Sequence, residues 1–313
     1  MATEYISNFE KKRKFLLTHE EFFLNGASGF LNLSYEQLLR YKPILTWHHI
    51  ASNEAIKWNE SIIDKFKNEI FVEDDIFPEI NCNRSLPWTI QFIERYENLW
   101  KWELLADNEH VMGNADIRKY FQNQLSPYME YYLASSTYTQ KHIEFQHPLE
   151  IDAAESIDWF HLSRNEMLPW NTELIEKYYD KWNWTVLSTN MSIPWDINLI
   201  KKFEDKIDWT IDKVKIVDGE EKITFYANSI SANLNIKWDA ELLSTFIKKL
   251  NTWDISISPE AKWDIDLLNQ FEDFWEYGGL SKNKSVWDKV FSEFDNPEYL
   301  NPLLDVILDK RKV

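Results

Sequence analysis

Large apolar residues recur along this chain at a spacing of 25 residues, and within each period they follow the rotation of an α-helix. The stretch from Trp170 to Trp195 shows the pattern: further tryptophans stand 12 and 14 residues after Trp170, and Trp195 begins the next unit. At about 100° per residue, positions 0, +4, +5, +8 and +12 fall within an arc of roughly 140°. The pattern therefore predicts one amphipathic helix of about three turns in each unit.

Copies of this unit occupy most of the chain. Position +8 is aromatic in nearly all of them, and the last unit, where Phe294 stands one residue early, is the exception. The predicted helix starts are Leu33, Trp58, Trp88, Gly113, Trp170, Trp195, Trp238, Trp263 and Trp287. Self-similarity at a fixed period of about 20 to 50 residues is typical of a repeat architecture.

Each predicted helix has an N-terminal cap. Position +1 holds a residue whose side-chain oxygen can accept a hydrogen bond from an N–H group of the first turn. These residues are Ser34, Asn59, Thr89, Asn114, Asn171, Asp196, Asp239, Asp264 and Asp288. The Trp before the cap and the apolar residue at +5 fit a hydrophobic staple, as Trp170 and Ile175 do, and Ser34 with Gln37 fits a capping box.

A second, shorter helix follows in each unit. It begins at pairs such as Asn183–Trp184, and Trp184, Leu187 and Ser188 share one of its faces. We expect a left-handed residue to end this helix at Asn190 and at the matching Asn53, Asn165, Asn233 and Asn283. Extended residues ending in Pro87, Pro169 or Pro194 then lead to the next Trp.

These patterns predict an all-α fold, a right-handed-type α-solenoid of 25-residue helix–turn–short-helix repeats with one inserted β-hairpin. A single unit cannot bury its own tryptophans, whereas stacked units can. The tryptophans of the repeat are therefore interpreted as core residues in preference to an aromatic cage or a base-stacking platform. Residues 1–32 are predicted to cap one body that spans 33–313.

Two insertions interrupt the repeat in the first half of the chain. The first, near 72–77, contains Glu73, Asp74 and Asp75, which suit either a contact with a cation or basic side chain or a solvated loop. The three adjacent acids lack the alternating ligand spacing of a calcium loop. The second, at 122–158, includes Tyr131 and Tyr132, in a tyrosine cluster that suits an interface or a worn repeat that still packs its aromatic residues.

The third insertion predicts a β-hairpin at 213–226. Alternating residues flank Asp218–Gly219, a dipeptide that favours a two-residue turn. Glu220 and Glu221 follow the turn and, with Asp218, form a second acidic cluster. Such a hairpin is either a recognition element or a segment that packs along the repeat body.

The balance of charge restricts the partners. The net charge of −18 and the pI near 4.9 predict repulsion from nucleic acids and from anionic lipid, and attraction to basic protein surfaces. Cys82 is the single cysteine, so no disulfide within the chain is possible. The N-terminus has no apolar signal core and no apolar run reaches membrane-spanning length, so the sequence predicts a cytoplasmic protein.

No motif for chemistry stands out. The seven histidines lack metal-ligand spacing, and the six glycines form neither a nucleophile elbow nor a phosphate loop. The sequence therefore predicts no enzyme activity, no metal and no cofactor, and gives no indication of the oligomeric state.

The string Trp-Asn-Trp-x-x-Leu-Ser-x-Asn-x-x-Ile-Pro-Trp at 182–195 resembles a class of short Trp-rich repeats found in bacterial proteins and in large DNA viruses. The resemblance covers residues 170–313 well and 33–125 loosely. The class has no established activity, so the resemblance implies a repeat fold and carries no site residues.

The sequence thus favours a scaffold that binds a basic protein surface, such as an inhibitor or immunity-like protein that masks its partner. Two alternatives stay open, a sensor of a small ligand or nucleotide in a Trp-lined groove and an enzyme with an unrecognised site. The candidate contact residues of the scaffold are Glu73, Asp74, Asp75, Asp218, Glu220, Glu221, Tyr131 and Tyr132.

Overall fold

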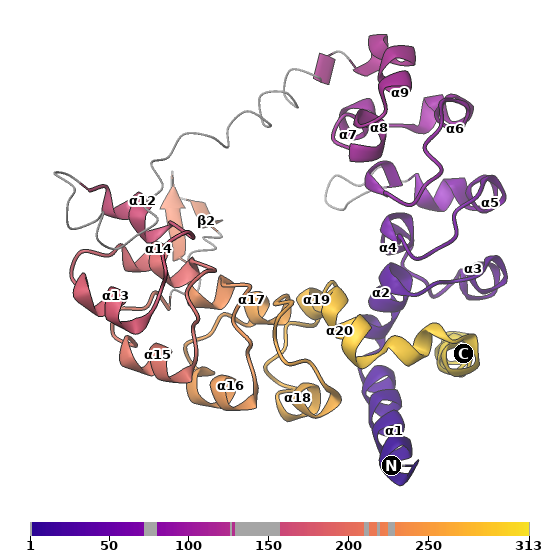
Figure 1. Ribbon diagram of the computed structural model, residues 1–313. Helices are drawn as coiled ribbons and strands as arrows, with labels where there is room; N and C mark the ends of the chain where they lie inside the picture. Colours follow the sequence, from indigo (N-terminus) through magenta and orange to yellow (C-terminus); the bar gives the residue numbers. More distant parts are fainter. Residues whose placement is uncertain are drawn as a thin grey trace. The chain divides into compact units, whose positions relative to one another are not determined.

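The computed structural model describes residues 2–71, 80–125, 127–128, 157–209, 213–217, 220–224 and 229–312. The regular secondary structure of the described residues is helical apart from one pair of strands, as the predicted all-α class requires (Figure 1). The chain divides into two compact units, residues 1–141 with 291–313 (unit 1) and residues 142–290 (unit 2). The repeat pattern alone predicts a single body after residue 32. The structure instead has two units, and residues 291–313 belong to the same unit as the N-terminal part of the chain.

Unit 1 holds two rows of helices (Figure 1). Helices α3, α5 and α6 form one row, and α2, α4, α7 and α8 form the other. Its elements are α1 (Ala2–Thr18), α2 (Glu20–Phe30), α3 (Tyr35–Tyr41), α4 (Trp47–Ser52), α5 (Glu60–Ile70), η1 (Ile80–Cys82), α6 (Ile90–Arg95), η2 (Glu97–Leu99), α7 (Trp102–Leu105), α8 (Glu109–Met112), α9 (Ala115–Tyr120), η4 (Ser292–Asp295) and α21 (Pro297–Lys310).

Unit 2 repeats the same alternation of longer and shorter helices. In Figure 1, α13, α15, α16 and α18 follow one another along the unit. Its helices are α12 (Trp159–Ser163), α13 (Thr172–Lys177), α14 (Trp184–Thr189), α15 (Ile197–Lys202), η3 (Ile230–Ala232), α16 (Ala240–Phe246), α17 (Thr252–Ser256), α18 (Ile265–Gln270), α19 (Tyr277–Leu280) and α20 (Lys284–Val290).

Two strands of unit 2 pair where the sequence pattern alternates. Strands β1 (Lys213–Val217) and β2 (Glu220–Thr224) are antiparallel, with Val217 opposite Glu220 and Lys213 opposite Thr224. The predicted turn residues, Asp218 and Gly219, lie outside the described residues.

The predicted N-caps are confirmed in eight of nine repeats. In each, the side-chain oxygen accepts a backbone N–H of the first turn, as Asn171 does from Leu174 at 2.9 Å. The eight caps are Ser34, Asn59, Thr89, Asn114, Asn171, Asp196, Asp239 and Asp264, and Ser34 with Gln37 forms the full capping box. Asp288 was wrongly predicted: α20 begins at Lys284, so Asp288 lies inside the helix and pairs with Lys284.

The tryptophan positions of the repeat differ in their hydrogen-bond acceptors. At Trp58, Trp88, Trp170 and Trp263, the first Trp donates its indole N–H to the carbonyl five residues earlier, as Trp170 does to Asn165 at 2.7 Å. The second donates to the carbonyl seven residues earlier, as Trp182 does to Ile175 at 3.0 Å. Burial of the ring and a bonded N–H together fix the rotation of the side chain. The structure therefore agrees with the interpretation of these tryptophans as core residues.

The asparagine that follows the short helix does not adopt the predicted left-handed conformation. Asn190 has φ −66° and ψ 115°, and Asn53 and Asn233 are extended in the same way. The asparagine acts through its side-chain amide and not through its backbone conformation. Asn190 is buried, and its Nδ2 donates to the carbonyls of Ser163 and Asn165 in the preceding repeat, at 2.9 and 3.2 Å. We call this series of inter-repeat bonds the asparagine ladder; its residues are Asn53, Asn83, Asn190, Asn233 and Asn283.

A serine of the short helix provides a second link between repeats. Ser188 Oγ accepts the backbone N–H of Asp208 at 3.0 Å, and Ser163, Ser231 and Ser256 act in the same way. The bond satisfies a backbone donor at the start of the next short helix, which would otherwise be orphaned. Together with the ladder, these serines set the spacing of successive repeats.

The N-terminal segment takes the place of a preceding repeat in unit 1. Asn53 Nδ2 donates to the carbonyls of Ser28 and Leu31, at 2.8 and 2.9 Å, and Ser28 Oγ accepts the N–H of Thr46 at 2.9 Å. Helix α2 therefore supplies the serine and the carbonyls that a short helix supplies elsewhere. The predicted capping segment is thus a modified half-repeat.

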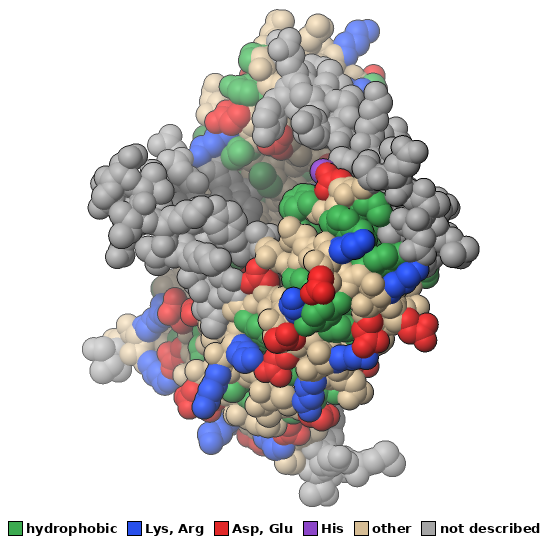
Figure 2. Space-filling model, turned by 90° about the vertical axis from the view of Figure 1, so that its left-hand side faces the viewer, with side chains coloured by type: hydrophobic (Ala, Val, Ile, Leu, Met, Phe, Trp, Pro, Cys, Tyr) green, Lys and Arg blue, Asp and Glu red, His purple; other side chains and the backbone are tan. Residues whose placement is uncertain are grey.

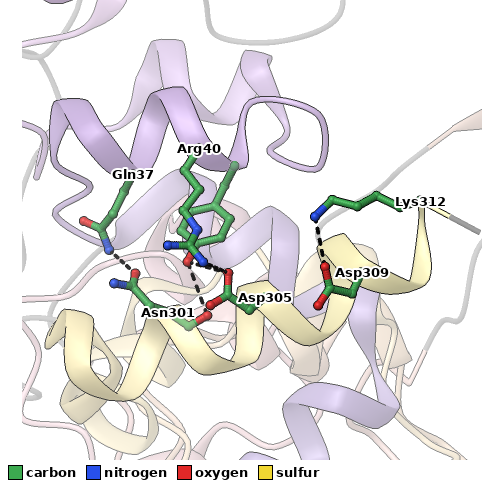
Figure 3. Close-up of polar contacts among 7 residues, drawn as sticks. Gln37, Arg40, Asn301, Asp305, Asp309 and Lys312 are labelled. Carbon is green, nitrogen blue, oxygen red and sulfur yellow. Dashed lines mark hydrogen bonds and ion pairs between the residues drawn. The ribbon is translucent and has the colours of Figure 1, made fainter.

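The C-terminal segment covers the first helices of unit 1. Phe9 stacks on Phe294 with ring centroids 5.3 Å apart, and Phe15 on Phe291 at 6.1 Å. Figure 3 shows α3 facing α21: Gln37 bonds Asn301 at 2.9 Å, and Arg40 and Tyr41 both reach Asp305. These contacts join residues more than 260 positions apart, so the repeat pattern could not predict them.

Candidate interaction surface

Basic side chains on the outer face of the longer helices pair with acids of the neighbouring repeat. In unit 2, Lys202 Nζ lies 2.6 Å from Glu176 and Lys249 Nζ lies 2.5 Å from Glu204. The same lysines lie over aromatic rings, Lys249 at 5.2 Å from the centroid of Trp209. Each exposed pair contributes less than about 1 kcal/mol to the stability of the fold. Together, however, the pairs leave these lysines already bound to acids of the same chain. Figure 2 shows acidic and basic side chains interspersed over one face of the molecule.

The other notable surface of unit 2 is formed by the extended segments between a short helix and the next Trp. These segments present apolar side chains to solvent: Met167 is 57% exposed, and Met191 and Leu234 are each 41% exposed. The corresponding segments of unit 1 carry polar residues such as Glu54, Arg84 and Ser85. We call the segments 166–170, 191–195, 234–238 and 259–263 the loop edge of unit 2.

A cavity of about 700 Å³ opens in this loop edge. Its apolar lining includes Met191, Ile193, Pro194, Trp195 and Leu242. Its charged lining consists of four carboxylates and two ammonium groups, those of Asp196, Asp239, Glu241, Glu260, Lys237 and Lys262. The cavity thus combines apolar walls with a local excess of negative charge.

Two of the four carboxylates are committed to the fold. Asp196 caps α15 by accepting the N–H of Leu199 at 2.8 Å. Asp239 caps α16 through Leu242 N–H at 3.0 Å and also binds Lys262 Nζ at 2.7 Å. Although partial burial opposes it, these two bonds hold the pKa of Asp239 below its usual value. Asp239 therefore stays ionised at neutral pH and neutralises Lys262.

The other two carboxylates, Glu241 and Glu260, are exposed. Neither has a hydrogen-bond or ion-pair partner among the described residues, and the same holds for Lys237. The cavity therefore offers two carboxylates to a ligand, with one lysine nearby.

The cavity lies where the repeat is interrupted. The hairpin insertion separates the repeat of Trp195 from that of Trp238, so the ladder bond from Asn233 to Ser188 spans 45 residues, against 27 from Asn190 to Ser163. The indole N–H groups of Trp195 and Trp238 are buried and have no acceptor among the described residues, unlike that of Trp170. The insertion thus coincides with a departure from regular repeat packing.

The predicted contact residues fall mostly elsewhere. Glu73, Asp74, Asp75, Tyr131, Tyr132 and Asp218 lie outside the described residues. Glu220 and Glu221 are consecutive residues of β2, opposite Val217 and Ile216 in the backbone register. None of the cavity residues was predicted to form a site. The only sequence signal was the recurrence of acids at the starts of the longer helices, which we interpreted as capping.

Other kinds of site find no support within the described part of the chain. No group of His, Cys, Asp or Glu there could hold a metal ion, and no helix is both long and apolar enough to cross a bilayer. Comparison with family models, with curated proteins and with solved structures yields no match to this chain. The function must therefore be inferred from the chain's own surface.

Proposed function

We propose that this protein is an α-solenoid scaffold, without enzyme activity, that binds a basic protein surface and masks it, as inhibitor or immunity proteins do. The observation that carries the proposal is the net charge of −18 on a body of stacked repeats. A rigid frame holds charged groups at fixed spacings, so its field can complement one particular partner and accelerate its association.

The distribution of charge supports this proposal. Lys202, Lys206 and Lys249 are already paired with acids of the same chain, so they do not screen the remaining carboxylates from a partner. The net charge of −18 also disfavours nucleic acids as direct ligands, because it repels their phosphate backbone.

The test has two stages. The purified chain, tagged and immobilised, is incubated with lysate of its native host at low and at high salt, and each retained protein is then purified and titrated against the chain. We expect a basic protein whose affinity falls steeply with salt and whose own activity the chain inhibits. Salt-independent binding, or binding without inhibition, would contradict the masking role.

The predicted acidic clusters provide variants for this titration. Charge reversal of Glu73, Asp74 and Asp75, or of Asp218, Glu220 and Glu221, should slow association and weaken binding if either cluster faces the partner. Unchanged affinity in both variants would remove both clusters from the interface.

The cavity favours a second candidate, a small ligand in a Trp-lined groove. Its volume of about 700 Å³ is in the range of small-molecule sites, and Trp195 lines it. Four carboxylates against two lysines disfavour a nucleotide and favour a cationic compound. Saturable quenching of tryptophan fluorescence by a cationic member of a ligand panel would support this candidate over a protein partner.

A further inference from the structure

The cavity in the loop edge of unit 2 has the chemistry of a pocket for a long basic side chain. We propose that it receives an arginine side chain from an extended segment of the basic partner. This inference rests on the proposed function and specifies where, within it, the partner is recognised.

The lining matches both parts of an arginine side chain. Met191 and Pro194, which are exposed in the cavity lining, offer apolar surface to the methylene stem, and long basic side chains bury their stems in this way. Glu241 and Glu260 offer carboxylates that no described residue occupies. A guanidinium group forms two parallel hydrogen bonds with a carboxylate and stacks on aromatic rings, whereas an ammonium group acts as a compact, strongly hydrated charge.

Other charged groups in the cavity lining already have partners within the chain, so Glu241 and Glu260 determine the sign of its net charge. Lys262 is held by Asp239, and Asp196 is engaged in capping α15. Of the groups that remain, Glu241 and Glu260 outweigh Lys237, so a cation is attracted and an anion is repelled.

The surroundings of the cavity suit an extended peptide segment. Met191, on its rim, is 41% exposed, and the neighbouring Leu234 is equally exposed. Asn235 Nδ2 donates to the Met191 carbonyl at 2.8 Å, which holds these two segments side by side. Apolar residues next to the arginine can therefore pack along the loop edge while the arginine enters the cavity.

The experiment compares two double variants of the full chain. Glu241→Gln with Glu260→Gln removes the two cavity carboxylates, while Glu166→Gln with Glu173→Gln removes two exposed glutamates of an earlier repeat. Glu173 stands two residues after its cap Asn171, as Glu241 stands two residues after Asp239, so the helix positions match. Both variants lose the same charge, and any difference between them reports location alone.

The ligand is an oligo-arginine peptide, with oligo-lysine and oligo-citrulline peptides of equal length, and binding is measured by calorimetry. We expect the cavity variant to bind oligo-arginine about tenfold more weakly than the wild type, which corresponds to about 1.4 kcal/mol, because the charge-assisted hydrogen bonds to the two carboxylates are lost. The Glu166/Glu173 variant should bind like the wild type, and oligo-citrulline should not bind.

Other results overturn the inference. Equal weakening in the two variants would show that only the overall charge matters, which leaves the basic-surface function standing without the cavity. Oligo-lysine bound as tightly as oligo-arginine would contradict the arginine assignment. If no basic peptide binds and the lysate also yields no salt-sensitive partner, the proposed function fails together with the cavity.

Discussion

The two units use the same repeat but satisfy its ends differently. In unit 1, α2 supplies the carbonyls of Ser28 and Leu31 to the first ladder residue, Asn53, and α21 covers α3. Unit 2 keeps the ladder up to Asn233. Like unit 1, which has an insertion near 72–77, it is interrupted within, by the hairpin insertion and by Ser258, which stands at a ladder position. Ser258 Oγ is buried without a partner among the described residues.

The comparison shows that the same repeat can either pack fully against a neighbour or leave space for a ligand. A repeat needs a neighbour that offers carbonyls and a serine, and any helix with the right terminal groups can provide them. Where the series is interrupted, as between Trp195 and Trp238, a cavity opens and becomes available to a ligand.

The largest expected effect is the destabilisation of unit 2 by removal of a buried tryptophan. Trp238 is fully buried, so Trp238→Ala should lower the free energy of unfolding by about 3–5 kcal/mol. Hydrogen–deuterium exchange of the full chain should show lost protection across unit 2, while unit 1, which has its own core, stays protected. Trp253→Ala, at a 40% exposed tryptophan of the same unit, is the control. Equal loss of protection in both units would mean that they unfold together.

A smaller effect tests the asparagine ladder. Asn283 is buried, and its Nδ2 donates to the carbonyls of Ser256 and Ser258 at 3.0 and 2.9 Å. Asn283→Ala should cost about 2–4 kcal/mol in urea denaturation, because two hydrogen bonds are lost and buried carbonyls are left unpaired. The matched variant Asn235→Ala removes an exposed inter-repeat bond of the same kind and should cost less than about 1 kcal/mol. Similar costs for the two would show that burial of the ladder is not what matters.

The smallest effect concerns the contact between α3 and α21 in unit 1. Burial, together with the hydrogen bond to Asp305, raises the pKa of Tyr41 to about 12. The folded state therefore retains the Tyr41 proton above pH 10, where the unfolded chain loses it, so this stabilisation is complete below pH 10 and disappears as the pH rises to about 12. Tyr41→Phe should cost about 1 kcal/mol at neutral pH and reduce the alkaline loss of stability.

Denaturant melts at a series of pH values measure this slope. Part of the slope should remain in Tyr41→Phe, because burial also raises the pKa of Tyr277 in unit 2. Tyr128→Phe, at a tyrosine of unit 1 that is 37% exposed, is the control. An unchanged alkaline slope in Tyr41→Phe would contradict the assignment to Tyr41.

The candidate cavity could not have been predicted, although its residues could be placed in their elements. Asp196 and Asp239 were identified as caps, and the hairpin insertion was located from its alternating residues. Whether a cavity opens depends on how two repeats pack across the insertion, and no local pattern reports that packing. Glu241 and Glu260 come to line the same cavity only when successive repeats stack.

The sequence by itself determined the interactions that close within a few residues. Asn171 caps its own helix three residues on, as its position before the helix predicted, and Trp182 bonds the carbonyl of Ile175 only seven residues back. The tertiary structure decided every interaction whose partner is remote. Asn190 is extended because its amide bonds Ser163, 27 residues earlier, and Tyr41 meets Asp305 across 264 residues. The sequence period specifies which hydrogen-bonding side chains each repeat carries, but the stacking of the repeats decides which groups they bond.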